Sequence, residues 1–170
     1  KGRNELSLIV CPASLVYNWE CEFKQFAPEL KTLPVTGNAA EREEKLAEAG
    51  QYDVLITSYD LLKRDILLYR ELSFRFQIID EAQYIKNANT LSAKAVKTVR
   101  ARTKFALTGT PIENRLSELW SIFDYLMPGF LFNYARFKKE YEVPVIKEQD
   151  EEALRNLHRM IGPFVLRRLK

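Results

Sequence analysis

Ile-Ile-Asp-Glu-Ala-Gln, at positions 78–83, is an apolar run that ends abruptly in two adjacent acidic residues. In an open α/β sheet, ligands gather at the carboxyl ends of the strands, so paired carboxylates there can face a metal-bound phosphate. Asp80 would then hold Mg²⁺ directly or through water, because this hard cation prefers few carboxylates, several waters and phosphate oxygens. Glu81 would orient and deprotonate an attacking water molecule. Taken alone, an Asp-Glu pair is more typical of a solvated turn, so its surroundings must decide.

The chain alternates short apolar runs with helical patterns. Near-continuous apolar runs, typical of strands buried on both faces, lie at 6–11, 54–57, 76–80 and 104–108, with a weaker one at 32–35. Helices are predicted at 15–26, 40–49, 90–99, 112–127 and 150–161. Strands that alternate with helices indicate an α/β fold, a doubly wound parallel sheet in a three-layer α/β/α arrangement.

Polar side chains follow each of the four stronger strands. They are Ser14 after the first, Thr57 and Ser58 at the second, Asp80 and Glu81 at the third, and Thr108, Gly109 and Thr110 at the fourth. The carboxyl ends of parallel strands meet at one edge of a sheet, so these residues are predicted to lie together. Hydroxyl groups and helix N-termini at such an edge suit phosphate oxygens, because unpaired N–H groups and the helix dipole favour anions.

Simpler roles are open for each of these hydroxyl residues. Ser14 could cap the helix that follows it, and Thr57 with Ser58 could close a turn. In the fourth segment, a glycine between two threonines allows a close backbone approach, which suits a loop that senses the terminal phosphate and bonds to the acidic strand. The alternative there is a tight turn into a helix that begins at Pro111.

Composition excludes several other classes of protein. The 170 residues, 46% hydrophobic and 29% charged, suit one soluble globular domain, and no apolar stretch approaches the roughly 18 residues of a membrane span. Cys11 and Cys21 lack the spacing of zinc ligands, and His158, the only histidine, lies in a charged, helical stretch. The net charge of +3 is too balanced to indicate a nucleic-acid partner by itself.

Two apolar stripes at helical spacing are predicted to face the core. Both recur at steps of three and four residues, which indicates packing and not a platform for stacked bases. The first consists of Val16, Trp19, Phe23 and Phe26, and the second of Leu116, Leu119, Phe123 and Leu126.

Residues distributed along nearly the whole chain carry a resemblance to a known family. They are Leu8 to Leu15 with Asn18-Trp19 and Glu22-Phe23, Ile56 to Asp60, Asp80 to Gln83 with Ile85-Lys86-Asn87, Leu107 to Asn114 with Leu119-Trp120-Ser121, and Pro163 to Arg168. In this order they resemble motifs Ia, Ib, II and III, and the junction to the second lobe, of the Swi/Snf family of DNA-translocating ATPases within the superfamily-two helicases.

This resemblance implies a RecA-like, P-loop-type lobe that works with a second lobe to hydrolyse ATP with Mg²⁺ and step along double-stranded DNA, independently of sequence. The implied nucleotide-site residues are Asp80 for the metal, Glu81 for the water, and Gln83. The implied coupling residues are Thr108, Gly109 and Thr110, and the candidates for DNA-phosphate contacts are Ser14, Thr57 and Ser58. Gln83, the fourth residue of the Asp80–Gln83 motif, and Glu113, shortly after Pro111, resemble the residues that prokaryotic members of the family have at these positions. The resemblance therefore implies a cytoplasmic, nucleoid-associated protein.

A P-loop is not found in the sequence. That motif needs a Gly-rich turn leading into Lys and Ser or Thr, and none of the six glycines is followed by Lys-Ser or Lys-Thr. In the family it lies upstream of motif Ia, so residues 1–141 are expected to form a partial first lobe. Residues 142–170, with a linker-like start at 142–149, are expected to form a helical segment leading towards the absent second lobe.

Two further expectations follow from a partial lobe. The sheet should have an edge that is left unpaired within the chain. Another copy of the chain, a rearranged segment or a crystal neighbour should cover that edge. The isolated chain should lack appreciable ATPase activity. The alternative is a degenerate lobe that binds DNA or a protein partner without hydrolysing ATP.

Overall fold

The structure is a computed structural model that describes residues 5–109 and 116–167. The chain forms two compact units, Lys1–Pro111 and Ile112–Lys170. The domain boundary expected after residue 141 stays a prediction. The predictions for Thr110, Pro111 and Glu113 lie outside the described residues.

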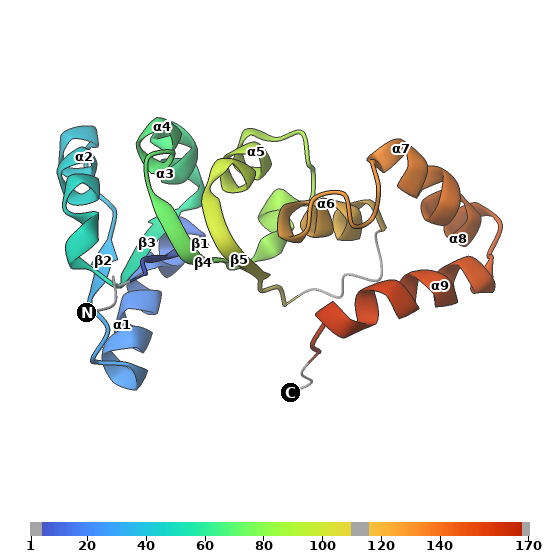
Figure 1. The fold of residues 1–170 in the computed structure, drawn as a ribbon, viewed down its shortest axis with the longest axis horizontal. Helices are drawn as coiled ribbons and strands as arrows, with labels where there is room; N and C mark the ends of the chain where they lie inside the picture. The colour runs from blue at the N-terminus through green and yellow to red at the C-terminus, as the bar shows by residue number, and fades with distance from the viewer. Residues whose placement is uncertain (1–4, 110–115, 168–170) are drawn as a thin grey trace. The chain divides into compact units, whose positions relative to one another are not determined.

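The first unit is built on a sheet of five strands in the order β2-β3-β1-β4-β5 (Figure 1). The strands are β1 (Ser7–Cys11), β2 (Thr32–Pro34), β3 (Val54–Ser58), β4 (Ser73–Ile79) and β5 (Arg100–Ala106). Every neighbouring pair of strands is parallel. The predicted α/β fold with a parallel sheet is thus confirmed.

The register aligns the carboxyl ends of the four strands that were predicted to carry polar residues. Cys11 of β1 lies opposite Ser58 of β3, and Val10 lies opposite Ile79 of β4. Beyond β5, the Leu107 amide donates to the Ile79 carbonyl oxygen at 2.8 Å. The segments that follow these strands therefore start from one edge of the sheet.

Helices cover the two faces of this sheet. Figure 1 shows α1 (Val16–Phe26) on one side and the other helices of the unit on the opposite side. Those others are α2 (Ala39–Ala47), α3 (Tyr59–Arg64), α4 (Ile66–Tyr69) and α5 (Leu91–Thr98). Short 3₁₀ turns lie at Ala13–Leu15, Ala49–Gln51 and Ala82–Ile85. In the part of the chain that is described, no helix is both long and apolar enough to cross a membrane.

Side-chain caps explain where three of these helices begin. Asn38 accepts a hydrogen bond from the Glu41 amide while the Glu41 carboxylate accepts one from the Asn38 amide, which is a capping box before α2. Ser58 caps α3 and Thr90 caps α5 in the simpler way, through the hydroxyl oxygen. The pair α3 and α4 was not predicted, because Ser58 ends a strand and starts a helix without an intervening loop.

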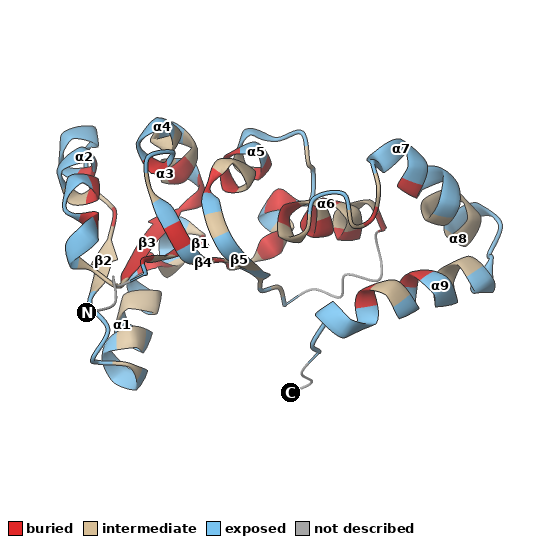
Figure 2. Cartoon of the chain, in the orientation of Figure 1, coloured by how far each residue is buried: buried red, intermediate tan, exposed pale blue. Residues whose placement is uncertain are grey.

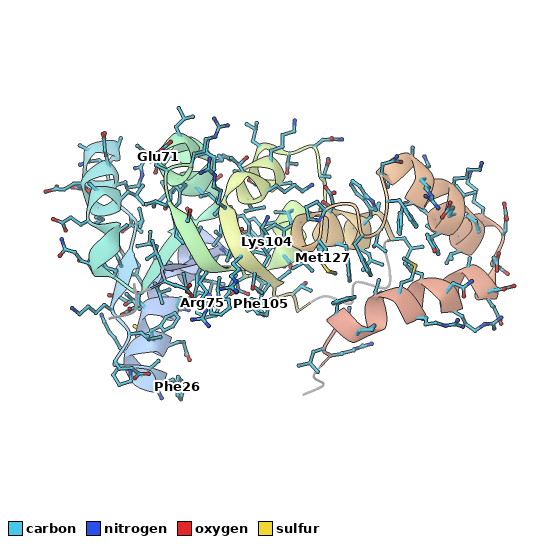
Figure 3. All side chains as sticks on the ribbon, in the orientation of Figure 1. Phe26, Glu71, Arg75, Lys104, Phe105 and Met127 are labelled. Carbon is cyan, nitrogen blue, oxygen red and sulfur yellow. The ribbon has the colours of Figure 1, made fainter. Side chains whose placement is uncertain are left out.

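The predicted apolar stripe of α1 packs on the sheet through most of its length. Val16 is buried in a cluster with Ile9 and Ile56, and Trp19 and Phe23 pack against that cluster. Phe26 was also predicted to face the core, but its side chain is 71% exposed. Phe26 is the last residue of α1, and Figure 3 shows it at the end of that helix, beyond the sheet.

The strand β5 forms an edge of the sheet. Among the described residues it pairs with β4 on one side and with no strand on the other. β3, in the interior, is buried throughout, whereas β5 is exposed over part of its length (Figure 2). The exposed residues of β5 include Arg100 and Arg102. An exposed edge of the sheet was expected from the sequence. That another chain or segment covers this edge in an assembly stays a prediction.

The second unit is helical. It contains α6 (Leu116–Leu126), α7 (Tyr134–Phe137), a π-helical turn at Lys138–Glu142, α8 (Val143–Lys147), α9 (Glu151–Ile161) and a 3₁₀ turn at Gly162–Phe164. Its core joins Leu116, Leu119 and Phe123 of α6 to Leu157 and Ile161 of α9, and Val145 packs against it. The linker-like segment 142–149 thus contains the short helix α8.

Candidate nucleotide site at the carboxyl edge of the sheet

Asp80 is the first residue after β4, and its carboxylate is held on both oxygens. Its amide donates to the Val10 carbonyl oxygen at 2.8 Å, which continues the pairing of β4 with β1. The indole Nε1 of Trp19 donates to Oδ2 at 3.0 Å, and the Glu81 amide donates to Oδ1 at 2.8 Å. The orientation of the carboxylate is thus fixed from two directions while the side chain stays partly exposed.

The backbone of Asp80 is also tied to the segment after β3. The Tyr59 hydroxyl donates to the Asp80 carbonyl oxygen at 2.7 Å. Tyr59 is buried, and its ring stacks on that of Tyr84 with centroids 5.0 Å apart and planes 7° from parallel. Burial, with the Asp80 carboxylate nearby, raises the pKa of Tyr59, so its hydroxyl remains a donor.

Glu81 has a backbone conformation that is uncommon outside glycine. Its φ of 52° and ψ of 56° lie in the left-handed region. Such a residue costs of order 1 kcal/mol or more and is typical of functional sites. The next residue, Ala82, is buried and its amide donates to the Leu107 carbonyl oxygen at 2.8 Å, so the turn is held against the segment after β5.

Gln83 connects Glu81 to the threonine loop. Its Nε2 donates to Glu81 Oε2 at 2.5 Å, and its Oε1 accepts from Thr108 Oγ1 at 3.1 Å. The sequence had suggested that this loop bonds to the acidic strand, and the structure contains that contact through the Gln83 amide. A continuous hydrogen-bonded path, which we call the Thr108–Gln83–Glu81 path, therefore joins the loop to the second acid.

The side chains at this edge fit Mg²⁺. Among the described residues no three His, Cys, Asp or Glu side chains are grouped to hold a metal. Mg²⁺ does not need such a cage, because it is usually bound by one or two carboxylates with waters and substrate phosphates. Each Asp80 oxygen uses one of its acceptor positions within the protein, so acceptor capacity remains for the ion or its waters.

Cys11 lies close to this site but is not suited to act as a nucleophile. Burial, reinforced by the Asp80 carboxylate, raises the pKa of the Cys11 thiol to about 12. The thiol remains protonated at neutral pH, whereas the thiolate is the reactive form. Cys11 therefore contributes packing to the buried cluster under α1.

The three candidates for DNA-phosphate contacts differ in exposure. Ser14 is exposed in the 3₁₀ turn after β1. Thr57 is fully buried and its hydroxyl donates to the Val35 carbonyl oxygen at 3.4 Å. Ser58 is also buried, and its hydroxyl oxygen accepts from the Leu61 amide at 3.2 Å. The simpler roles considered for Thr57 and Ser58 are thus present, and DNA contact by these residues stays a prediction that falls mainly on Ser14.

Two residues of the site were missed as functional candidates. Trp19 was assigned to core packing alone, although its indole N–H reaches Asp80. Tyr59 was quoted only within a motif, although its hydroxyl holds the Asp80 backbone. An indole or phenol that must be buried usually finds a hydrogen-bond partner, which is the signal that could have indicated both.

The parallel sheet, with an Asp-Glu pair and Thr108 at its carboxyl edge, has the α/β architecture of a RecA-like lobe. The sequence profile described as SNF2-related domain matches residues 1–170. The chain belongs to this family, whose members are ATP-dependent helicases of the Swi/Snf type.

Known relatives come from bacteria, eukaryotes and archaea. The chain is 43% identical to an uncharacterized ATP-dependent helicase of Mycoplasma genitalium over 96% of its own length and 15% of the relative's. It is 40% identical to the TATA-binding protein-associated factor MOT1 of Saccharomyces cerevisiae, over 96% of its own length and 9% of that protein. The Sulfolobus solfataricus SWI2/SNF2 ATPase core solved with double-stranded DNA superposes with a TM-score of 0.88 at 40% identity, over 98% of this chain and 34% of that one. The chain thus spans a small part of each of these relatives.

Proposed function

We propose that this chain carries the hydrolytic acids of an ATP-dependent DNA translocase of the chromatin-remodeller type. The observation that carries the proposal is the Thr108–Gln83–Glu81 path beside an Asp80 carboxylate that is held on both oxygens. A solvated acidic turn has no need of such connections. These hydrogen bonds are suited to a site that must orient the carboxylates of Asp80 and Glu81 and respond to the loop that contains Thr108.

Asp80 would hold Mg²⁺, directly or through water, and Glu81 would orient and deprotonate the attacking water. Bound Mg²⁺ neutralises charge on the phosphate oxygens of ATP. Glu81 follows Asp80 through a left-handed turn, so the two carboxylates start from different backbone directions. The Gln83 amide restricts the Glu81 carboxylate by donating to one of its oxygens.

Thr108, with Gly109 and Thr110, would couple the loss of the terminal phosphate to movement. Support for this role comes from the bond between Thr108 and Gln83, which links the loop to the same acid that would activate water. A change in position of Glu81 when phosphate leaves would therefore be transmitted through one amide to the loop. In the parent protein this movement would be relative to a second RecA-like lobe.

Double-stranded DNA is the proposed track. Support comes from the solved relative, which is a SWI2/SNF2 core in complex with double-stranded DNA, and from the exposed position of Ser14. Contacts to phosphates position a protein without reading bases, so binding would be independent of sequence and weakened by salt. We also propose a cytoplasmic, nucleoid-associated location in a prokaryote, and no appreciable ATPase activity for this chain in isolation.

The test is Glu81→Gln in the full-length parent protein. ATP turnover in the presence of Mg²⁺ and DNA should fall by at least about 100-fold, because a carboxamide cannot accept the proton from water. Nucleotide binding, measured by fluorescence titration, should be retained. The matched control is Glu71→Gln, because Glu71 is exposed on the surface of the same unit (Figure 3) and should leave turnover unchanged. Normal turnover in Glu81→Gln would remove Glu81 from the mechanism, whereas absence of turnover in the unsubstituted parent protein would support a non-hydrolytic binding module instead.

A further inference from the structure

Trp19 connects α1 to the acidic pair through a single hydrogen bond. Its indole Nε1 donates to Asp80 Oδ2 at 3.0 Å, between residues 61 positions apart in the sequence. The rest of the indole ring is held by packing, since it lies against the buried cluster around Ile9 and Ile56. Phe23, one turn further along α1, places its ring 6.1 Å from that of Trp19. The position of the donor is therefore set by the core of the unit.

The chemistry of this donor suits a carboxylate that must also serve a metal. An indole N–H is neutral and can only donate, so it orients the carboxylate without adding a competing positive charge. Together with the Glu81 amide on Oδ1, it fixes the plane of the carboxylate. Groups that orient metal ligands in this way tune metal affinity as well as geometry.

A cleft borders the same carboxylate. It has a volume of about 270 Å³ and is lined by Leu15, Asn18, Trp19, Glu22 and Asp80. Four of these five side chains come from the turn and helix that follow β1. The Trp19 ring thus forms part of the wall beside Asp80, where an ion with its waters could reach the carboxylate.

We propose that Trp19 is a positioning residue that orients Asp80 for Mg²⁺ and thereby sets the metal affinity of the site. This inference rests on the proposed role of Asp80 as the residue that holds the metal. It assigns to the apolar stripe of α1 a function beyond packing: one member of the stripe carries the only polar group that reaches the acid from that helix among the described contacts.

Trp19→Phe tests the inference, because phenylalanine keeps an aromatic ring in the cluster while it removes the N–H donor together with part of the indole. In the full-length parent protein, the affinity for Mn²⁺ in the presence of a non-hydrolysable ATP analogue should fall by about 10-fold or more, measured by electron paramagnetic resonance. The Mg²⁺ concentration that gives half-maximal ATP turnover should rise by a similar factor, and excess Mg²⁺ should restore much of the turnover. Tyr17→Phe is the matched control, since the Tyr17 hydroxyl lies on the same helix, is exposed and pairs with Thr36 at 3.1 Å.

A second measurement uses the unsubstituted parent protein, so it does not depend on the folding of a variant. The indole N–H resonance of Trp19 should shift during Mg²⁺ titration in the presence of the ATP analogue, with a midpoint equal to the metal affinity. Unchanged Mn²⁺ affinity in a folded Trp19→Phe variant, or an indole resonance that does not respond to Mg²⁺, would overturn the inference.

Asp80→Asn separates this inference from the proposed function. If Asp80→Asn loses turnover while Trp19→Phe keeps the normal Mg²⁺ dependence, the role of Asp80 stands and the positioning role of Trp19 fails. If Asp80→Asn turns over ATP normally, the proposed function itself fails. Loss of turnover in Asp80→Asn together with a raised Mg²⁺ requirement in Trp19→Phe supports both.

Discussion

At the scale of single residues, Asp80 and Glu81 are neighbours in sequence with different surroundings. Asp80 continues the β-sheet ladder and is fixed by Trp19 and by the Glu81 amide. Glu81 turns away in the left-handed region and is bonded to the Gln83 amide. The sequence predicted the place of both acids, because an apolar run that stops at a charged pair marks the end of a buried strand. It could not predict their partners, because those come from segments distant in the sequence.

Thr108→Val should uncouple hydrolysis from movement. It removes the hydroxyl that donates to Gln83 and keeps a β-branched side chain of similar size. DNA translocation by the parent protein should slow several-fold for each ATP consumed, measured by triplex displacement alongside phosphate release. Thr103→Val, at an exposed position of β5, is the matched control. An unchanged ratio of displacement to ATP consumed in Thr108→Val would contradict a coupling role for this hydroxyl.

Cys11 should resist thiol reagents in the folded protein. Its pKa is raised to about 12, so the reactive thiolate becomes abundant only as the pH approaches that value. The exposed Cys21 should therefore be alkylated by iodoacetamide at pH 8 while Cys11 remains unmodified, as measured by peptide mass spectrometry. Denaturant should make the two cysteines equally reactive. Rapid modification of Cys11 in the native protein would be inconsistent with its buried position against Asp80.

At the scale of elements, the sequence located β1 and β3 well, whereas β4 begins at Ser73, before its predicted start at 76, where exposed and buried residues alternate. β1 and β3 lie in the interior of the sheet and were located to within a residue at each end. β5 was predicted to begin at 104 but begins at Arg100, because its edge position leaves Arg100 and Arg102 facing solvent. An edge strand thus lacks part of the continuous apolar run that reveals an interior strand.

The ion pair between Arg42 and Asp65 joins α2 to the α3–α4 segment. Arg42 Nε and Nη2 donate to the two Asp65 oxygens at 2.6 and 2.8 Å, and both side chains are at least 90% buried. Arg42→Met should destabilise this unit by about 3 kcal/mol, because it leaves the Asp65 charge buried and unpaired. Hydrogen exchange of β3 amides in the parent protein measures this loss.

Lys63→Met provides the matched comparison for that prediction. Lys63 pairs with Asp60 at 2.5 Å, but this pair is on the surface, with the Asp60 side chain 67% exposed. Its loss should change stability by about 0.5 kcal/mol or less. Equal effects of Arg42→Met and Lys63→Met would show that burial does not distinguish the two pairs.

At the scale of the whole molecule, the chain forms two compact units and spans a small part of each relative that it matches. The sheet unit holds the acids, the Thr108 loop and α1, and the helical unit has its own apolar core. The polar stretch 142–149, which looked linker-like, contains the short helix α8, and Val145 packs against the core of the helical unit. Polarity along the sequence could not show this helix, because none of its side chains is fully buried.

The central claim is that Asp80 and Glu81 form the metal and water side of an ATPase site. The most direct measurement is a crystal structure of the parent protein with Mg²⁺ and a non-hydrolysable ATP analogue. We expect the ion at Asp80, either at roughly 2.1 Å or one water molecule away, with a water molecule hydrogen-bonded to Glu81 and next to the terminal phosphate. An ion and phosphates bound away from both carboxylates would contradict it.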